Sequence, residues 1–432
     1  MASVSRGRSA QGPVKSKTCR GIGGIREQEI PFLCLRTAAR LRQDSPTESY
    51  EESVHPIPAI LGGPPAFPDG PPPWPPSTDD VRDAVARAMN EGTWGGYHGP
   101  HVEELERRLA ERYQTPHVLT CSSGTIAVEA ALRAIGVGPG DEVVLAAYEY
   151  ESNFLTVHAI GARPVLVDVS AKNFNLDPAR LTGAIGPQTK AILVSHLHGG
   201  IVPMDAVSAL GVPVVEDCAQ CPGAAIGPKP CGSFGTVGTL SFGGSKLLAA
   251  GRGGALLFQD ERAYRRAKLW LHRGVQAWAA LSELQAAVLL PQLERLHADT
   301  IQRAGAVLRI AEERVPGLEL FENAPGSMPA YYKVGFRFDP IAFELSRDVF
   351  LRAARAEGIA FDAGFAALHL GRSPSRFRAA GPLTEAARAG ETVVKLHHPV
   401  LLAGNESVEI VARTLANIYR NASEISAAFP PS

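Results

Sequence analysis

The chain has 432 residues, of which 45% are hydrophobic and 20% charged, and its formal net charge is −1. This length is enough for two or three domains with a sizeable core, and the balanced charge does not favour nucleic acid or membrane partners. The sequence contains no apolar run long enough to span a bilayer, and six cysteines in so long a chain do not make a disulfide framework, so the expected location is a reducing cytoplasm.

The N-terminal region, residues 1–58, differs in composition from the rest. It is rich in arginine and serine, and it lacks the continuous apolar segment that a secretory signal requires. We expect a disordered tail here, with an organellar transit peptide as the alternative. The next segment, 59–76, is dense in proline and is expected to be an extended arm rather than a packed element.

The folded part is expected to begin with a helix at Asp79, because Ser77 and Thr78 precede an amphipathic run in the pattern of a helix start. Strands and helices then alternate. The strands are short, rich in valine and apolar throughout, which is typical of parallel strands buried on both faces. Strands are expected at 117–121, 142–148, 163–169, 190–196, 213–217, 237–242 and 253–258, with a helix at 125–136.

The fold class that follows is α/β, with a large, mostly parallel-sheet domain over 77–300. A long amphipathic run beginning at Leu281 is expected to form helices that are interrupted at Pro291. The remaining strand and helix patterns predict a smaller α+β domain over 301–423, and residues 424–432 are expected to be a tail.

Three motifs carry chemistry. Ser123, Gly124 and Thr125 lie between a strand and a helix, where free backbone N–H groups and the helix dipole can bind phosphate, although an ordinary helix cap has the same sequence. Asp217 ends a strand expected to be central, and ligands of parallel sheets bind beyond the carboxyl ends of strands. Lys246 lies in a buried, glycine-rich segment, where desolvation lowers the pKa of an amine and allows it to form a Schiff base.

Together these motifs suit pyridoxal 5'-phosphate (PLP). The hydroxyl and glycine cradle would hold the phosphate, Asp217 would keep the pyridine nitrogen protonated, and Lys246 would carry the cofactor and move protons. A solvent-exposed lysine at position 246 is the alternative, but it does not explain why all three motifs occur together.

At these residues the chain resembles the DegT/DnrJ/EryC1/StrS aminotransferases, which are fold type I PLP enzymes. The resemblance runs from about Gly62 to Tyr419 and includes SSGTIAVEAALRAIGVGPGDEVVLAAYEY, VVEDCAQCPGA, GSFGTVGTLSFGGSK, GRGGAL and LSELQAA. It implies that Lys246 and Asp217 are catalytic, that Tyr150 stacks on the cofactor ring and that Gln220 reaches the ring hydroxyl. The implied cofactor-binding residues are Ser123, Gly124, Thr125, Tyr150, Asp217, Gln220, Ser241 and Lys246.

Some positions depart from the family pattern. Leu247 and Pro222 stand where the family commonly has Asn and His. In the stretch before SELQ, Trp278 replaces an Asn that reaches the phosphate of the neighbouring subunit, and Ala280 replaces an Arg. The resemblance implies a homodimer with shared active sites. Because tryptophan has one N–H to donate and a large apolar surface, we expect Trp278 to pack across the subunit boundary.

No metal is expected. Cys218, Cys221 and Cys231 lack a fourth ligand at a suitable spacing for zinc, and His196 and His198 would face opposite ways on a continued strand.

The expected function is transfer of an amino group from glutamate or glutamine to a nucleotide-linked keto-sugar or a cyclitol ketone, through a Schiff base at Lys246. The resemblance supplies the donors and acceptors. Two alternatives stay open: another PLP reaction such as elimination, and a non-catalytic relative that binds PLP or a sugar.

Overall fold

The computed structural model describes residues 56–273 and 276–430, which belong to one compact unit over 52–432. The tail predicted over 1–58 therefore lies outside the described residues, except for its last three. Within the described residues, no helix combines the length and the apolar character needed to cross a membrane.

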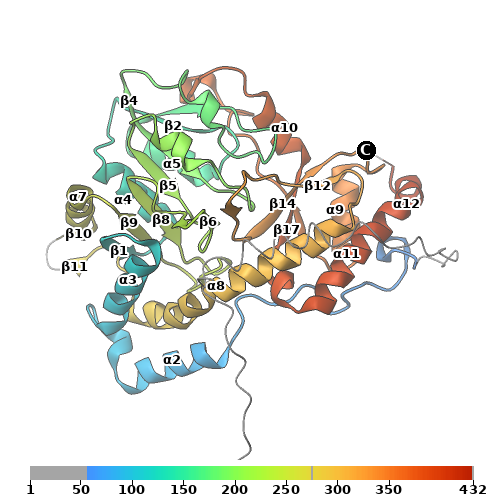
Figure 1. Ribbon diagram of the computed structural model, residues 1–432, viewed down its shortest axis with the longest axis horizontal. Helices are drawn as coiled ribbons and strands as arrows, with labels where there is room; N and C mark the ends of the chain where they lie inside the picture. The colour runs from blue at the N-terminus through green and yellow to red at the C-terminus, as the bar shows by residue number, and fades with distance from the viewer. Residues whose placement is uncertain (1–55, 274–275, 431–432) are drawn as a thin grey trace, which may run out of the picture. The chain divides into compact units, whose positions relative to one another are not determined.

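The larger sheet positions the site and, within the described part of the chain, has eight strands (Figure 1). The strand order is β1-β9-β8-β5-β4-β2-β3-β16, and only β9 runs antiparallel to its neighbours. The mostly parallel sheet agrees with the fold class expected from the sequence. The strands span His117–Cys121 (β1), Glu142–Ala146 (β2), Arg163–Val167 (β3), Thr189–Ser195 (β4), Val214–Asp217 (β5), Val237–Ser241 (β8), Gly254–Phe258 (β9) and Arg378–Ala379 (β16).

Helices pack against this sheet and bury its valine-rich strands in one hydrophobic cluster. The helix α4 packs against β8 and β9, and its side chains that face the sheet are mostly alanine, which allows a close approach. These helices are α4 (Gly124–Ala134), α5 (Glu151–Ala159), α6 (Met204–Ser208), α7 (Glu261–Leu271) and α10 (Thr384–Thr392), with short 3-10 turns at Pro178–Arg180 (η3) and Pro374–Arg376 (η4).

A second, antiparallel sheet has the order β12-β14-β17-β15 and carries its own hydrophobic cluster with α9 and α11. The C-terminal segment expected to be a tail instead forms α12, and Ile425 is buried against this cluster. The elements are β12 (Leu318–Leu320), β14 (Lys333–Phe338), α9 (Arg347–Ala356), β15 (Phe361–Ala363), β17 (Val393–His397), η5 (His398–Leu402), α11 (Asn405–Arg420) and α12 (Ala422–Ala428). The small strand pairs are β10 (His272–Arg273) with β11 (Gln276–Ala277), and β6 (Ala225–Ile226) with β7 (Lys229–Pro230) and β13 (Ser327–Met328).

Helix α8 (Glu283–Glu312) extends from the larger sheet to the second one (Figure 1). The predicted interruption at Pro291 is wrong: the helix continues through this residue. A proline removes only one helical hydrogen bond, and buried leucines on both sides, Leu289 and Leu293, keep the helix packed. The helix starts with a capping box of Ser282 and Gln285, and α2 (Asp79–Asn90), η2 (Thr93–Gly95) and α3 (Pro100–Tyr113) pack against it.

The LSELQ stretch at the start of α8 also fixes α3. The fully buried Glu283 accepts hydrogen bonds from the backbone N–H groups of His101 (2.8 Å) and Val102 (3.2 Å), at the start of that helix. A carboxylate at a helix N-terminus satisfies free donors and is favoured by the helix dipole.

The proline-rich segment is packed, contrary to the expectation of an arm that makes no packing contacts. The Glu357 carboxylate accepts hydrogen bonds from the backbone of Ala59, in the 3-10 turn η1 (Ala59–Leu61), and from the backbone of Ala66. The side chain of Phe67 packs against the second cluster. Proline-rich chain has little conformational entropy to lose when it docks, and here apolar side chains between the prolines supply the contacts.

Candidate functional site

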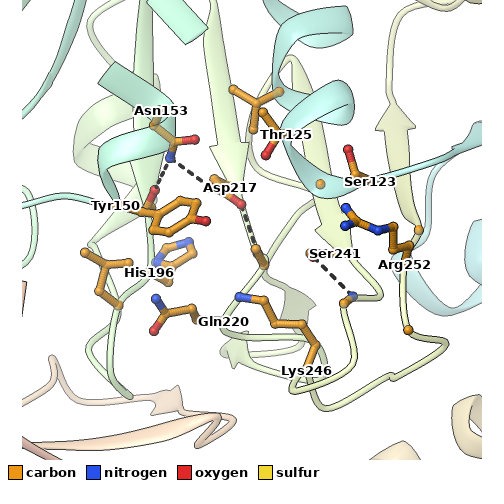
Figure 2. A pocket seen from close by; sticks show the side chains of 18 residues that line it. Ser123, Thr125, Tyr150, Asn153, His196, Asp217, Gln220, Ser241, Lys246 and Arg252 are labelled. Carbon is orange, nitrogen blue, oxygen red and sulfur yellow. Dashed lines mark hydrogen bonds between the residues drawn. The ribbon is translucent and has the colours of Figure 1, made fainter. Parts of the chain in front are cut away.

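One cavity lies at the edge of the larger sheet where parallel strands β4, β5 and β8 end (Figure 2). The cavity is lined by every residue that the sequence analysis proposed as catalytic or cofactor-binding, although these residues come from separate strands and loops. They are Ser123, Gly124, Thr125, Tyr150, Asp217, Gln220, Ser241 and Lys246.

The phosphate cradle is formed where β1 leads into α4. Ser123 is the N-cap of α4, and its Oγ accepts a hydrogen bond from the Ile126 backbone N–H (3.2 Å), which leaves its own O–H free to donate. Gly124 is required for packing, because a Cβ there would lie 2.7 Å from the Ser241 Cβ. The cradle therefore combines helix N–H groups with the hydroxyl groups of Ser123, Thr125 and Ser241.

Asp217 lies at the end of β5 and is held in a fixed orientation by three donors. Asn153 Nδ2 donates to Oδ2 (2.9 Å), while the Ala219 backbone N–H (3.0 Å) and Thr239 Oγ1 (3.3 Å) donate to Oδ1. The sequence analysis missed Asn153 and Thr239. Thr239 is the β8 residue in register with Asp217, so strand order and register were needed to find it.

A second buried carboxyl group, Glu149, lies close to Asp217. Burial, and then the negative charge of Asp217, raises the pKa of Glu149 to about 8. Asn153 Nδ2 also contacts Glu149 Oε1 (3.4 Å) and Ser195 Oγ (3.1 Å). At neutral pH Glu149 is therefore mainly protonated.

Lys246 points into the same cavity (Figure 2). Burial lowers the pKa of its ammonium group, and the attraction of Asp217 opposes this shift. Its Nζ lies 4.4 Å from the centroid of the Tyr332 ring. The loop is anchored from outside the larger sheet, because Trp74 Nε1 donates to the Lys246 carbonyl (3.0 Å) and the hydroxyl groups of Ser245 and Tyr332 are hydrogen-bonded (2.9 Å).

Tyr150 and Gln220 line the side of the cavity that lies away from Ser123 (Figure 2). Tyr150 is the residue preceding α5, and 47% of its surface is exposed, so its ring is available to cover a bound planar group. Gln220 is buried, and its Oε1 accepts a hydrogen bond from the His198 backbone N–H (3.1 Å).

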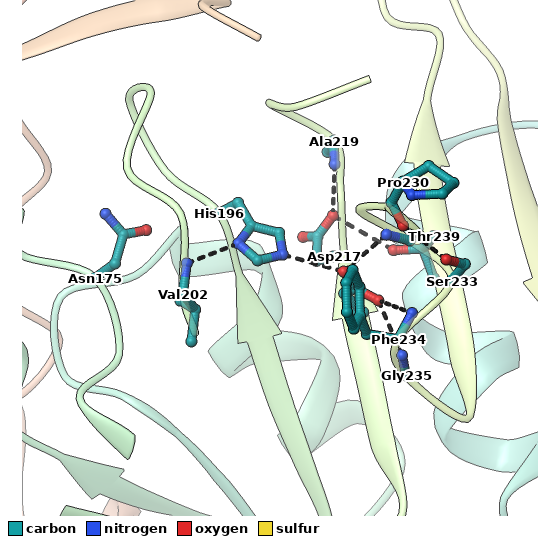
Figure 3. Close-up of polar contacts among 12 residues, drawn as sticks. Asn175, His196, Val202, Asp217, Ala219, Pro230, Ser233, Phe234, Gly235 and Thr239 are labelled. Carbon is teal, nitrogen blue, oxygen red and sulfur yellow. Dashed lines mark hydrogen bonds and ion pairs between the residues drawn. The ribbon is translucent and has the colours of Figure 1, made fainter. Parts of the chain in front are cut away.

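Figure 3 shows a network of polar contacts that involves His196, Asp217, Phe234 and Gly235. Glu216 accepts hydrogen bonds from the backbone of Gly232, Phe234 and Gly235, and it contacts His196 Nε2 at 3.1 Å. The other ring nitrogen of His196 accepts from the Val202 backbone N–H (3.0 Å). Both ring nitrogens of His196, which also lines the cavity, are thus engaged within the fold.

This network bears on the possibility of a metal site. His196 lies near the cysteines and could act as a further metal ligand. Two sets of three residues have ligand atoms within 4.8 Å of one another: His196 with Cys218 and Cys221, and His196 with Glu216 and Cys231. Burial raises the pKa of the Cys218 thiol, and the thiolate is the metal-binding form. The hydrogen bonds of His196 and Glu216 account for their polar atoms without an ion.

Trp278 follows the short strand β11 and is 43% exposed. Its indole N–H donates to the Trp270 carbonyl (2.9 Å), and the two indole rings meet edge to face with centroids 5.0 Å apart. The indole N–H of Trp278 is therefore bonded within its own chain.

The residues present fit PLP. The cradle offers neutral donors and a helix N-terminus for a phosphate, Asp217 offers a fixed carboxylate for a protonated ring nitrogen, and Lys246 offers an amine whose neutral form is favoured by burial. Gly124 has no side chain, which allows a close approach to its backbone, and a Cβ there would lie 2.7 Å from the Ser241 Cβ.

Comparison with known proteins agrees with this assignment. Residues 76–415 match the DegT/DnrJ/EryC1/StrS aminotransferase family. An L-glutamine:2-deoxy-scyllo-inosose aminotransferase of Micromonospora echinospora is 32% identical over 85% of this chain and 99% of its own. A 3-amino-5-hydroxybenzoate synthase of Amycolatopsis mediterranei is 31% identical over 81% of this chain and 98% of its own. The crystal structure of a 3-amino-5-hydroxybenzoic acid synthase, 29% identical, superposes with a TM-score of 0.72 over 81% of this chain and 99% of its own.

Proposed function

Because the chain belongs to the DegT/DnrJ/EryC1/StrS family and is a PLP-dependent aminotransferase, we propose that Lys246 and Asp217 are its catalytic residues and that its acceptor is a cyclitol ketone. The observation that carries the proposal is that the hydroxyl cradle, the oriented carboxylate and the amine with a lowered pKa line a single cavity.

When bound, PLP supplies a conjugated ring that accepts the electron pair released at the amino-bearing carbon. Lys246 would hold the cofactor and, when its amine is free, would be the base that moves the proton of the substrate carbon. Asp217, oriented by Asn153 and Thr239, would hold the proton on the pyridine nitrogen. Tyr150 would cover one face of the ring and Gln220 would donate to the ring hydroxyl, while Ser123, Gly124, Thr125 and Ser241 would hold the phosphate.

The relatives support the choice of substrates. The Micromonospora relative is named for L-glutamine as donor and a cyclitol ketone as acceptor, and it aligns with 85% of this chain. We therefore propose L-glutamine or L-glutamate as the donor and a ring ketone such as 2-deoxy-scyllo-inosose as the acceptor. A nucleotide-linked keto-sugar is the second candidate acceptor.

We further propose a cytoplasmic homodimer with shared active sites, in which residues 77–300 and 301–423 act as large and small domains. Exposed aromatic side chains support the dimer: Tyr97 is 79% exposed and lines, together with Ala280, a cleft beside the 270–281 segment. All four cysteines in the described part of the chain are unpaired thiols, which suits a reducing compartment.

The test is an absorption spectrum of the purified protein before and after addition of L-glutamine or L-glutamate, followed by addition of each acceptor. The expected result is loss of the PLP absorption with the donor and its return with the cyclitol ketone. Lys246→Ala should abolish this cycle and the borohydride-dependent attachment of cofactor, whereas the exposed Lys172→Ala should behave as the wild type.

Other outcomes would point elsewhere. Return of the absorption only with a nucleotide-linked keto-sugar would favour the second acceptor. Release of a 2-oxo acid and ammonia over many turnovers from an amino acid with a β leaving group, such as L-serine, without an acceptor, would indicate elimination. Cofactor binding without any spectral response to either donor would indicate a non-catalytic relative, and normal turnover of Lys246→Ala would contradict the assignment.

A further inference from the structure

The cavity contains a cation that the sequence analysis did not assign. Arg252 lines the cavity, and its guanidinium group extends toward Ser123 on the side of the phosphate cradle (Figure 2). No hydrogen bond or ion pair of this guanidinium occurs among the described residues, although other arginines of the chain pair with carboxylates. The group is thus exposed to solvent and available to a ligand.

Backbone packing holds Arg252 beside the cradle. The next residue, Gly253, forms a parallel bridge with Ser123, and a Cβ at Gly254 would lie 2.6 Å from the Ser123 carbonyl oxygen. On the other side, the Arg252 carbonyl accepts a hydrogen bond from Gln285 Nε2 (2.8 Å), near the start of α8. The segment 251–254 is therefore fixed directly against the first turn of α4, and the Arg252 Cα cannot move far from the cradle.

The charges around the cavity give this arginine a function. Among the described residues that line it, only Asp217, Lys246 and Arg252 belong to the fully charged residue types. Asp217 acts electrostatically on Lys246, and the two residues are assigned to the ring nitrogen and to the carbonyl carbon of the cofactor, not to its phosphate. The cradle offers only neutral donors to a phosphate dianion, so Arg252 is the cation that can balance its charge.

The departure from the family pattern at Trp278 points the same way. At this position the family places a side chain that reaches the phosphate of the neighbouring subunit, whereas the Trp278 N–H is bonded to Trp270 in its own chain. We infer that Arg252 binds the phosphate of PLP in the same chain, a contact that the family makes from the position of Trp278. This inference rests on the proposed cofactor site and adds a cofactor-binding residue to it.

The experiment compares two cofactor probes that differ only in the phosphate: PLP and pyridoxal. Wild type, Arg252→Gln and Arg252→Lys are depleted of cofactor and titrated with each probe, and binding is followed by absorbance and by intrinsic fluorescence. Far-UV circular dichroism checks the fold, and Arg87→Gln, a change of the same type on the exposed surface of α2, is the control.

Arg252→Gln is expected to raise the half-saturating concentration of PLP by about tenfold, the lower end of the effect of one charge-assisted hydrogen bond, and to leave that of pyridoxal unchanged. Arg252→Lys should fall between the two, because it keeps the charge but not the planar pair of donors. The Arg87→Gln control should bind both probes as the wild type does.

In the holoenzyme, the ³¹P resonance of PLP should also shift in Arg252→Gln, which is a readout independent of activity. Equal weakening of both probes, or no change for PLP, would overturn the inference. A wild type that binds neither probe would overturn the proposed cofactor site itself, and the inference with it.

Discussion

The contact between Trp74 and the Lys246 loop yields a quantitative prediction. Trp74 belongs to the proline-rich segment, yet its indole N–H donates to the Lys246 carbonyl at 3.0 Å. Its ring meets His398 edge to face, with centroids 4.3 Å apart, and the guanidinium of the buried Arg303 lies 5.7 Å from the ring. This segment therefore takes part in holding the catalytic lysine, 172 residues further along the chain.

The substitution Trp74→Phe keeps a ring against His398 but removes the donor. Loss of one hydrogen bond costs about 1 kcal/mol, and a weaker interaction with Arg303 adds about 0.5 kcal/mol. A total of roughly 1–2 kcal/mol corresponds to about a 5- to 30-fold increase in the population of the released loop. Because small displacements of a catalytic group are costly, the rate of the half-reaction with the donor should fall at least as much.

Hydrogen exchange measured by mass spectrometry would test the first part. Amides of the Lys246 loop, such as those of Ala249 and Ala250, are bonded to Gln292 Oε1 and to the Phe242 carbonyl, and they should exchange about 5- to 30-fold faster in Trp74→Phe. Phe67→Leu is the matched control, because Phe67 lies in the same segment but packs against the second cluster. Unchanged exchange and turnover in Trp74→Phe would refute the reasoning.

Three further predictions concern Asp217, Glu149 and Trp278. Asp217→Asn keeps the shape of the side chain but removes the charge facing the ring nitrogen. The single-turnover rate with the donor should therefore fall roughly 10- to 100-fold. A rate equal to that of the wild type would show that the ring nitrogen does not face Asp217. The pKa of Glu149 is about 4.3 in the unfolded chain and about 8 in the fold, so the folded state binds more protons between these pH values. The free energy of unfolding should therefore fall as the pH rises through this window. Denaturant titrations of Glu149→Gln should show a smaller fall. Trp278→Ala should weaken self-association about tenfold in sedimentation measurements. Its loss of PLP retention should be smaller than its loss of self-association if Arg252 binds the phosphate. A wild type that is active as a monomer would contradict this expectation.

Most of the larger sheet can be predicted from the sequence, because its strands are continuous apolar runs of β-branched residues. The expected bounds of β1 match the observed ones, and those of the other predicted strands agree within about two residues. The helix interruption expected at Pro291 is wrong, because a local rule about proline does not include the leucine packing that keeps α8 continuous.

The parts of the site that the sequence does not reveal depend on distant contacts. Asn153 reaches Asp217 from a helix 64 residues away in the chain, and Trp74 reaches Lys246 from a segment whose composition suggests no packing. Neither contact leaves a local pattern in the sequence. Strand ends, by contrast, are local features, which is why Asp217 can be proposed from the sequence pattern, whereas Ser241 is implied by the family resemblance.

Arg252 shows why the direction of one strand decides what a residue can do. In a parallel strand, the residue just before the strand lies at the amino edge of the sheet, away from the ligand. The strand β9 is antiparallel to both β1 and β8, so its first residues, and Arg252 before them, lie at the carboxyl edge beside the cradle. Reversing β9 would put the same arginine on the opposite edge, where no phosphate could reach it. Its proximity to Ser123 therefore follows from a single antiparallel strand in an otherwise parallel sheet, and the sequence of GRGGAL alone does not specify that direction.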